Sequence, residues 1–303
     1  MKIRVISGTV YFFIWAALFA LKCCIPAGWG ALAFDALFLA VAVIGALELT
    51  RAMRVHTAQR VLAVSFCAAC VPLFVAVQMT GNFVTGNGMY SIGIAFAAVA
   101  VLFEVYALIL LILSLKNSEK FTYKNLAKSL FACIYAGVLC CVLAAVNHLS
   151  ENSFAALLLI FFAVSFTDSC AYFTGRLLGK KVPLKLAPQI SPNKTVIGAA
   201  GGVLGGMLGG VIAYFISYAV SIATGDTLVT TSHLHPAVIF LLFGFALAVV
   251  GQVGDLFESA VKRKCDIKDM GKIMPGHGGI MDRFDSVLFC GVATLALFAI
   301  LVA

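Results

Sequence analysis

Charged residues are scarce in this chain of 303 residues: Asp, Glu, Lys and Arg make up 11% of it, whereas 62% of the residues are hydrophobic. Soluble globular domains average about 25% charged and about 45–50% apolar residues. So few charges cannot cover a surface that faces water, which excludes a soluble globular protein. The seven Pro and 27 Gly are not gathered into linkers, and no low-complexity segment interrupts the chain. We therefore expect one polytopic membrane domain over residues 1–303.

The sequence offers neither a convincing signal-peptide cleavage site nor a convincing redox motif. An apolar stretch follows Lys2 and Arg4, but no small-x-small cleavage site ends it, so we interpret it as an uncleaved first span. Most of the ten cysteines lie inside apolar runs, where cysteine packs as a small hydrophobic residue. Cys67 and Cys70 have the spacing of a redox motif, but a lipid-embedded helix is a poor setting for thiolates. We therefore favour packing over redox chemistry for this pair.

Long apolar runs predict transmembrane helices, because a helix that crosses the bilayer needs about 20 mostly apolar residues. The sequence offers nine candidates, near residues 6–25, 31–48, 61–79, 91–115, 126–146, 154–173, 196–222, 235–254 and 286–303. Spans 1–5 occupy residues 1–150. Spans 6–9 occupy residues 151–303, together with two polar loops near 174–195 and 255–285.

The basic residues predict the orientation, because cytoplasmic loops of membrane proteins carry an excess of Lys and Arg. With nine spans and the N-terminus inside, every Lys and Arg except Lys22 falls in a cytoplasmic segment. We predict an all-α integral membrane protein with its C-terminus outside and both polar loops at the cytoplasmic face. The net charge of +8 needs no nucleic-acid partner, because basic loops face anionic lipid headgroups.

Several carboxylates stand at the ends of predicted spans. Asp255 follows one span, and Asp282 and Asp285 open the next. Such carboxylates are costly unless they are paired, hydrated or bound to a cation. Mg²⁺ binds one or two carboxylates and completes its shell with water and phosphate oxygens. Asp255 and Asp282 therefore indicate either a shared Mg²⁺ site or helix capping with pairing to Arg283. Glu48, near the cytoplasmic end of its span, we interpret as hydrated.

A glycine-rich turn precedes Asp282. His277, Gly278 and Gly279 form a segment whose glycines permit tight turns and close approach to a ligand. Successive backbone N–H groups in such a turn can cradle a phosphate. A plain turn re-entering the membrane has the same sequence, so both interpretations stay open.

The first polar loop carries a second set of candidates. Asp168 falls in the cytoplasmic third of its span, and an intramembrane acid is a functional candidate by default. Further along, Ser191, Lys194 and Thr195 offer two hydroxyls and a cation to a phosphate. Ser and Thr are also favoured N-caps of a following helix, which is the alternative. The Walker frame of glycines is missing.

The span that follows this loop is rich in glycine. Small residues at four-residue spacing let helices approach closely in lipid. We expect packing within the fold or at a dimer contact from two such rows: Gly201, Gly205 and Gly209, and Gly202, Gly206 and Gly210.

The second polar loop resembles the signature of a known family. The pattern is Ser259-x-x-Lys262-Arg263-x4-Lys268-Asp269-x-Gly271-x3-Pro275-x-His277-Gly278-Gly279-x-x-Asp282-Arg283-x-Asp285. It resembles the signature of phosphatidate cytidylyltransferases, or CDP-diacylglycerol synthases. Residues 168–198 are similar to the second polar region of this family, and residues 4–7 to its start. Two positions depart from the pattern: Met274 replaces the usual Leu, Ile or Phe, and Ile197 replaces a frequent Glu.

The resemblance implies a Mg²⁺-dependent enzyme that converts CTP and phosphatidate into CDP-diacylglycerol and diphosphate. It implies a nine-span homodimer in the cell membrane, an active site on the cytoplasmic side, and room for a second cation such as K⁺. By motif match, Asp255 and Asp282 would bind the metal. The catalytic residues would be Asp255, Lys262, Arg263, His277, Asp282 and Asp285. The substrate-binding residues would be Asp168, Arg176, Ser191, Lys194, Thr195, Ser259, Lys268, Gly278, Gly279 and Arg283.

Two other functions remain as alternatives. A CTP-dependent polyprenol or phytol kinase would transfer the γ-phosphate to an alcohol and release CDP instead of diphosphate. An ion-coupled transporter would use intramembrane acids, but transporters often show internal repeats and sites at the membrane midplane. We find no repeat in this sequence, and its polar residues gather at one predicted face.

Overall fold

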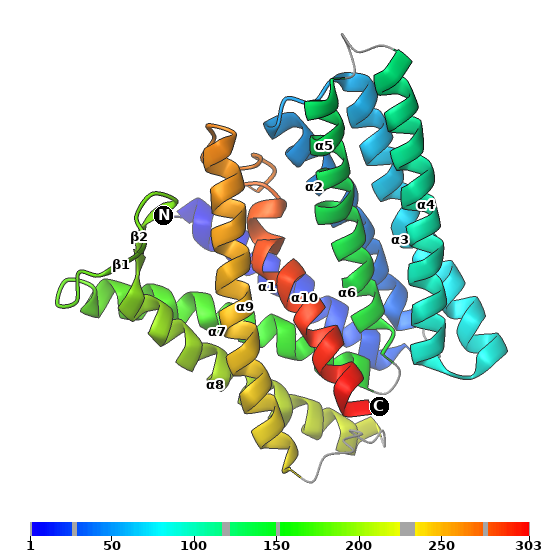
Figure 1. Ribbon diagram of the computed structural model, residues 1–303. Helices are drawn as coiled ribbons and strands as arrows, with labels where there is room; N and C mark the ends of the chain where they lie inside the picture. Colours follow the sequence, from blue (N-terminus) through cyan, green and yellow to red (C-terminus); the bar gives the residue numbers. More distant parts are fainter. Residues whose placement is uncertain are drawn as a thin grey trace. The chain divides into compact units, whose positions relative to one another are not determined.

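The computed structural model describes residues 2–25, 29–116, 122–149, 152–224, 234–274 and 278–302. These residues form long helices and one small hairpin (Figure 1). The elements are α1 (Lys2–Cys24), α2 (Trp29–Ala52), α3 (Thr57–Thr85), α4 (Gly88–Lys116), α5 (Tyr123–Ala132), the π-helix η1 (Cys133–Val138), α6 (Leu139–Asn147), α7 (Ser153–Leu178), β1 (Lys185–Ala187), β2 (Ser191–Thr195), α8 (Val196–Thr224), α9 (Pro236–Lys264) and α10 (Met281–Val302).

The helices confirm a multi-pass α-helical membrane protein. Within the described residues, eight helical segments are long and apolar enough to cross a bilayer, and α5, η1 and α6 together form one of them. The apolar part of α1, Thr9–Cys24, is shorter. Each of the nine predicted spans overlaps a helix. The count of nine crossings and the orientation stay predictions.

Helices α7 and α9 extend into the two predicted polar loops. Helix α7 continues to Leu178, and the rest of the first loop contains the hairpin β1–β2, where Lys185 pairs with Thr195 and Ala187 with Ser191. Helix α9 continues to Lys264, so Asp255 lies inside a helix and the second loop is residues 265–280. Hydropathy alone ends a helix where charges begin. The last turns of α9 nevertheless consist of good helix formers such as Leu, Glu, Ala, Lys and Arg.

The chain forms two compact units. Unit 1 comprises Met1–His148 and Cys265–Phe284, and unit 2 comprises Leu149–Lys264 and Asp285–Ala303. Helices α1 to α6 and the α9–α10 loop belong to unit 1, whereas α7 to α9 and the hairpin belong to unit 2. Helix α10 begins in unit 1 and continues in unit 2.

The glycines of α8 bring three helices of unit 2 into close contact. A Cβ atom at Gly209 would lie 2.5 Å from the carbonyl oxygen of Phe162 on α7. A Cβ atom at Gly206 would lie 2.5 Å from the Cβ of Ala248 on α9. One glycine row therefore contacts α7 and the other contacts α9. The structure confirms packing within the fold as the role of these rows.

Unit 1 buries the two thiols of α3 and hydrogen-bonds a buried amide of α6. Cys67 and Cys70 on α3 are fully buried free cysteines, and a Cβ atom at Gly137 of η1 would lie 3.0 Å and 3.2 Å from their sulfurs. This confirms packing as their role. On α6, the Asn147 side chain donates to Asp35 at 2.9 Å and accepts from Lys22 at 2.7 Å. The one basic residue predicted on the outer side is thus bonded to a buried amide.

We predict that Gly209→Ala destabilises the protein. The added methyl group would overlap backbone atoms of α7, and overpacking of this kind costs about 1–3 kcal/mol. The measurement is the midpoint of thermal unfolding in detergent, which we expect to fall by several degrees. Gly93→Ala on α4 is the matched control, because its added Cβ meets no atom within 4 Å and alanine favours a helix. Equal midpoints for the two variants would refute the packing role.

Candidate active site

A cavity of about 540 Å³ lies within unit 2. Its walls come from α7, the hairpin, the first turns of α8 and the middle of α9. Its lining residues combine acids, bases, amides and small residues: Asp168, Ala171, Tyr172, Gly175, Arg176, Leu186, Asn193, Lys194, Thr195, Gly198, Ala199, Gln252 and Asp255. Five of the residues predicted from the sequence therefore meet at one cavity: Asp168, Arg176, Lys194, Thr195 and Asp255.

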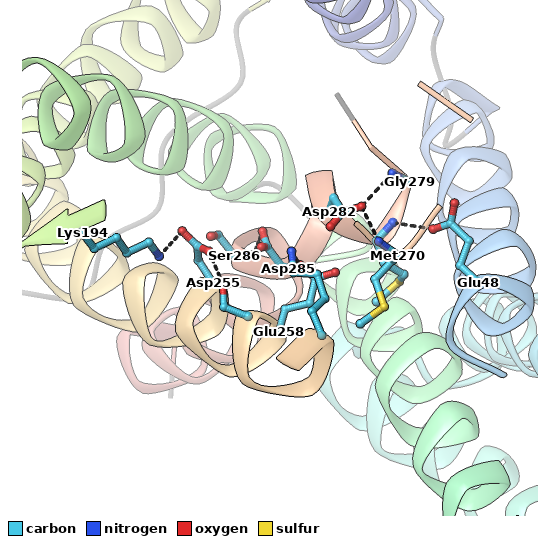
Figure 2. A network of polar contacts seen from close by, with 12 residues as sticks. Glu48, Lys194, Asp255, Glu258, Met270, Gly279, Asp282, Asp285 and Ser286 are labelled. Atoms are coloured by element: carbon cyan, nitrogen blue, oxygen red, sulfur yellow. Dashed lines mark hydrogen bonds and ion pairs between the residues drawn. The ribbon is translucent and has the colours of Figure 1, made fainter. Parts of the chain in front are cut away.

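An ion pair joins the hairpin to α9 in this cavity. The Lys194 ammonium on β2 donates to Oδ2 of Asp255, and Figure 2 shows the two side chains reaching toward each other. About 28% of the Lys194 side chain and 31% of the Asp255 side chain are exposed. Ser259, one helical turn further along α9, donates to the other carboxylate oxygen of Asp255 at 3.5 Å. Lys194 and Asp255 are thus neutralised by each other while remaining accessible.

Further acids and bases continue along α9 and α10 within unit 2. Lys262 donates to Glu258 at 3.4 Å, and the Glu258 side chain is fully buried. Asp285 of α10 is 8% exposed and forms a side-chain hydrogen bond with Glu258. One basic residue therefore faces a buried pair of acids. Glu258 was not predicted from the sequence, because its proximity to Asp285 on the next helix leaves no pattern in the sequence.

The cavity wall on α7 is formed by residues at helical spacing. Asp168, Tyr172 and Arg176 are four residues apart and therefore lie on one face of α7. Arg176 donates to the Tyr172 hydroxyl at 2.9 Å, and its guanidinium lies 6.0 Å from the centre of the Tyr172 ring. This contact orients a cation beside the cavity.

The hairpin holds its position through one further bond to α9 and one helix cap. Nε of Arg263 donates to the carbonyl oxygen of Ile190, in the turn of the hairpin, at 3.2 Å. The Thr195 hydroxyl accepts from the backbone N–H of Gly198 at 3.1 Å. The helix-capping alternative for Thr195 is therefore confirmed, and Arg263 has a structural bond in addition to its predicted role. Ser191, predicted to bind substrate, lies in β2 and is half-buried.

The loop of unit 1 that precedes α10 is organised around Asp282. Oδ2 of this residue accepts from the backbone N–H of Met270 at 2.9 Å and of Gly279 at 2.7 Å, as Figure 2 shows. Met274 and Gly278 form an isolated bridge that closes the loop. Gly278 has φ +86°, and a Cβ atom there would lie 2.6 Å from Oδ2 of Asp282. The glycine at 278 is required both by its conformation and by the carboxylate.

Three other predicted site residues belong to this part of the chain. His277 lies outside the described residues. Lys268 and Arg283 are exposed in unit 1. Asp255 belongs to unit 2 and Asp282 to unit 1, and a cation shared between them stays a prediction.

Glu48 on α2 is a participant that the sequence interpretation missed. It is only 4% exposed, and its two oxygens accept the backbone N–H groups of Ile280 and Met281, each at 3.1 Å. The expectation that Glu48 is hydrated is therefore wrong. Its position at the end of an apolar span was visible in the sequence, but its partners lie more than 230 residues away along the chain.

The carboxylates are also candidate ligands of a metal ion. Within the part of the chain that the structure describes, no group of three or more His, Cys, Asp or Glu side chains is arranged to hold a metal ion. Mg²⁺ needs only one or two protein carboxylates when phosphate oxygens and water complete its shell. Asp255 lines the cavity with a partly exposed carboxylate, so its oxygen donors fit the chemistry of Mg²⁺.

Fold and site together define a multi-pass membrane protein with a cavity in which acidic and basic side chains meet. The chain belongs to the cytidylyltransferase family, whose model matches residues 2–301.

Individual relatives carry a more specific name. The chain is 37% identical to the phosphatidate cytidylyltransferase of Bacillus subtilis over 208 residues, which cover 69% of this chain and 68% of that protein. It is 35% identical to the phosphatidate cytidylyltransferase of Staphylococcus saprophyticus, covering 60% of this chain and 62% of that protein. For the phosphatidate cytidylyltransferase of Brucella melitensis the identity is 38%, over 56% of each chain.

We predict that Lys194 and Asp255 are energetically coupled. Each single change, Lys194→Met or Asp255→Asn, removes the ion pair, so the two effects on stability overlap in the double variant. Because both side chains are partly exposed, we expect a coupling of about 1 kcal/mol in a double-mutant cycle of thermal unfolding. A second cycle with Lys185→Met, an exposed lysine of β1, is the control and should be additive. Additivity in the first cycle as well would show that the pair contributes nothing.

Proposed function

We propose that this protein is a phosphatidate cytidylyltransferase, which transfers the cytidylyl group of CTP to phosphatidate. The observation that carries the proposal is the match of almost the whole chain to the cytidylyltransferase family, together with relatives that bear this name. The cavity of unit 2 adds physical support, because Lys194 and Arg176 line it beside Asp255.

The reaction needs charge neutralisation and positioning more than a strong base. An oxygen of the phosphatidate phosphate forms a bond to the α-phosphorus of CTP, and the bond from that phosphorus to the α,β-bridging oxygen breaks. Diphosphate leaves with the electron pair of the broken bond. The attacking phosphate is already ionised at neutral pH, so no proton has to be removed from it. Such transfers are catalysed mainly by positioning and electrostatic stabilisation.

The basic residues of unit 2 have separate roles in this proposal. Lys194 exchanges its bond to Asp255 for a phosphate oxygen when the nucleotide enters the cavity, which leaves the Asp255 carboxylate open to a cation. Arg176 offers a second cation on the same wall. Lys262 and Arg263 offset the negative charge of the diphosphate and of the lipid phosphate. His277 would act as a hydrogen-bond donor that positions a phosphate.

Mg²⁺ is part of the proposal through the oxygen donors of Asp255 and Asp282. When bound, Mg²⁺ would neutralise charge on the triphosphate. The chain's own contribution is to present two carboxylates whose positions are fixed by other protein groups. A second cation such as K⁺ and a homodimer are further expectations of the family resemblance.

The membrane setting constrains where the two substrates meet. Phosphatidate keeps its acyl chains in the bilayer and its phosphate at the level of the headgroups, whereas CTP is a water-soluble polyanion. We propose nine crossings with the N-terminus in the cytoplasm, which place the hairpin and the 265–280 loop at the cytoplasmic face of the cell membrane.

The proposed reaction predicts which product forms and how activity depends on the carboxylate of Asp282. With CTP labelled at the α-phosphate, purified protein should transfer the label to lipid in the presence of Mg²⁺ and not after chelation. Asp282→Asn keeps an acceptor oxygen for the N–H groups of Met270 and Gly279 but removes the charge. We expect turnover to fall at least about 100-fold, as expected when a charged contact worth about 3 kcal/mol is lost.

The matched control is Asp266→Asn in the same loop. Asp266 is exposed and has φ 54°, a conformation that asparagine also adopts, so its turnover should stay normal. If the α-phosphate label instead remains in water-soluble CDP while the γ-phosphate is transferred to an alcohol, the protein is a kinase. Normal turnover of folded Asp282→Asn would remove this residue from the site.

A second prediction concerns the side of the membrane. Two variants are compared, one that retains only Cys24, at the end of α1, and one that retains only Cys265. Cys24 should react with an impermeant maleimide on intact cells, whereas Cys265 should react only after the membrane is opened. Burial raises the pKa of the Cys265 thiol above its usual value, so the reaction is run at alkaline pH. Labelling of Cys265 on intact cells would reverse the proposed orientation.

A further inference from the structure

Two carboxylates from distant parts of the chain bind three successive backbone N–H groups at the start of α10. The N–H of Gly279 donates to Asp282, and the N–H groups of Ile280 and Met281 donate to Glu48 (Figure 2). The first N–H groups of a helix have no partner within the helix, and the helix dipole favours a negative charge there. Glu48 therefore caps α10 from another helix, α2, within unit 1.

The glycines of the loop show how closely Glu48 approaches it. A Cβ atom at Gly279 would lie 2.5 Å from both oxygens of Glu48, and one at Gly271 would also overlap this carboxylate. Any side chain at either position would push Glu48 away from the N–H groups that it accepts. Two glycines on both sides of the turn are thus explained by one buried acid rather than by the backbone conformation.

We propose that Glu48 is a positioning residue for the reaction, which fixes the segment from Gly278 to Asp282 and through it the carboxylate of Asp282. This inference rests on the proposed function, because it assigns the 265–280 loop to the active site. Glu48 itself touches neither substrate. Its effect passes through the backbone: Gly279, one residue before the two N–H groups that Glu48 binds, donates to Asp282.

A helix cap with only a structural role makes a different prediction from a positioning residue. Loss of a structural cap lowers stability, and activity falls only as far as folded protein is lost. Loss of a positioning residue lowers kcat in protein that remains folded, because the loop samples other conformations. Local loosening is visible as faster hydrogen exchange of the amides at 279–281.

The experiment compares Glu48→Ala and Glu48→Gln with wild-type protein. Glutamine keeps one acceptor oxygen in the same space and should restore part of the effect. For Glu48→Ala we expect kcat to fall at least about tenfold, consistent with one or two lost hydrogen bonds to a charged group. We expect the KM for CTP to change little, and a peptide covering residues 278–284 to exchange faster. The matched control is Thr50→Val on the same helix, a fully buried residue whose hydroxyl bonds only within α2.

The outcomes separate this inference from the proposed function. If wild-type protein makes no CDP-diacylglycerol, the proposed function fails, and the positioning role fails with it. If the wild type is active and Glu48→Ala retains normal kcat, the inference alone is overturned. It is also overturned if Glu48→Ala loses activity only in proportion to thermal stability, as Thr50→Val does, or if exchange at 278–284 does not change. A fall in kcat with faster exchange, partly restored in Glu48→Gln, supports it.

Discussion

An acidic side chain in an apolar helical protein needs a pairing partner, water or a cation, because lipid offers no hydrogen-bond donors. The ammonium of Lys194 meets this need for Asp255, and backbone N–H groups meet it for Asp282 and Glu48. Each bond also fixes the orientation of the carboxylate that it serves. Each carboxylate is therefore held in place by its own unit, which is the condition under which charged groups stabilise a transition state most effectively.

Small residues allow the helices that carry these side chains to approach each other closely. In unit 2, Gly175 of α7 and Gly198 of α8 lie so near each other that a Cβ atom at Gly198 would be 3.3 Å from the Cα of Gly175. Both glycines line the cavity. Close packing of two helices therefore brings the acidic and aromatic face of α7 next to the capping hydroxyl of Thr195. In lipid such contacts stabilise helix pairs through packing, since burial of apolar surface gains little there.

The sequence allowed the helical membrane fold and much of the site to be predicted. Apolar runs located each helix, and the family pattern pointed to Lys194, Asp255 and Asp282, which the structure shows bound to specific partners. The ends of the helices could not be predicted, because hydropathy does not detect a charged helical segment such as residues 255–264. The partner of Glu48 could not be predicted either. A contact between α2 and the start of α10 depends on tertiary structure and leaves no periodicity in the sequence.

The hairpin of unit 2 is a ribbon of only two short strands, and such ribbons are marginally stable when isolated. Two side-chain bonds to α9 support it, one from Lys194 to Asp255 and one from Arg263 to the turn at Ile190. Both bonds use a cation as the donor. An anion that enters the cavity therefore competes with Asp255 for Lys194, one of the two cations that restrain the ribbon. For this reason, the binding of an anion in the cavity and the mobility of the ribbon are thermodynamically linked.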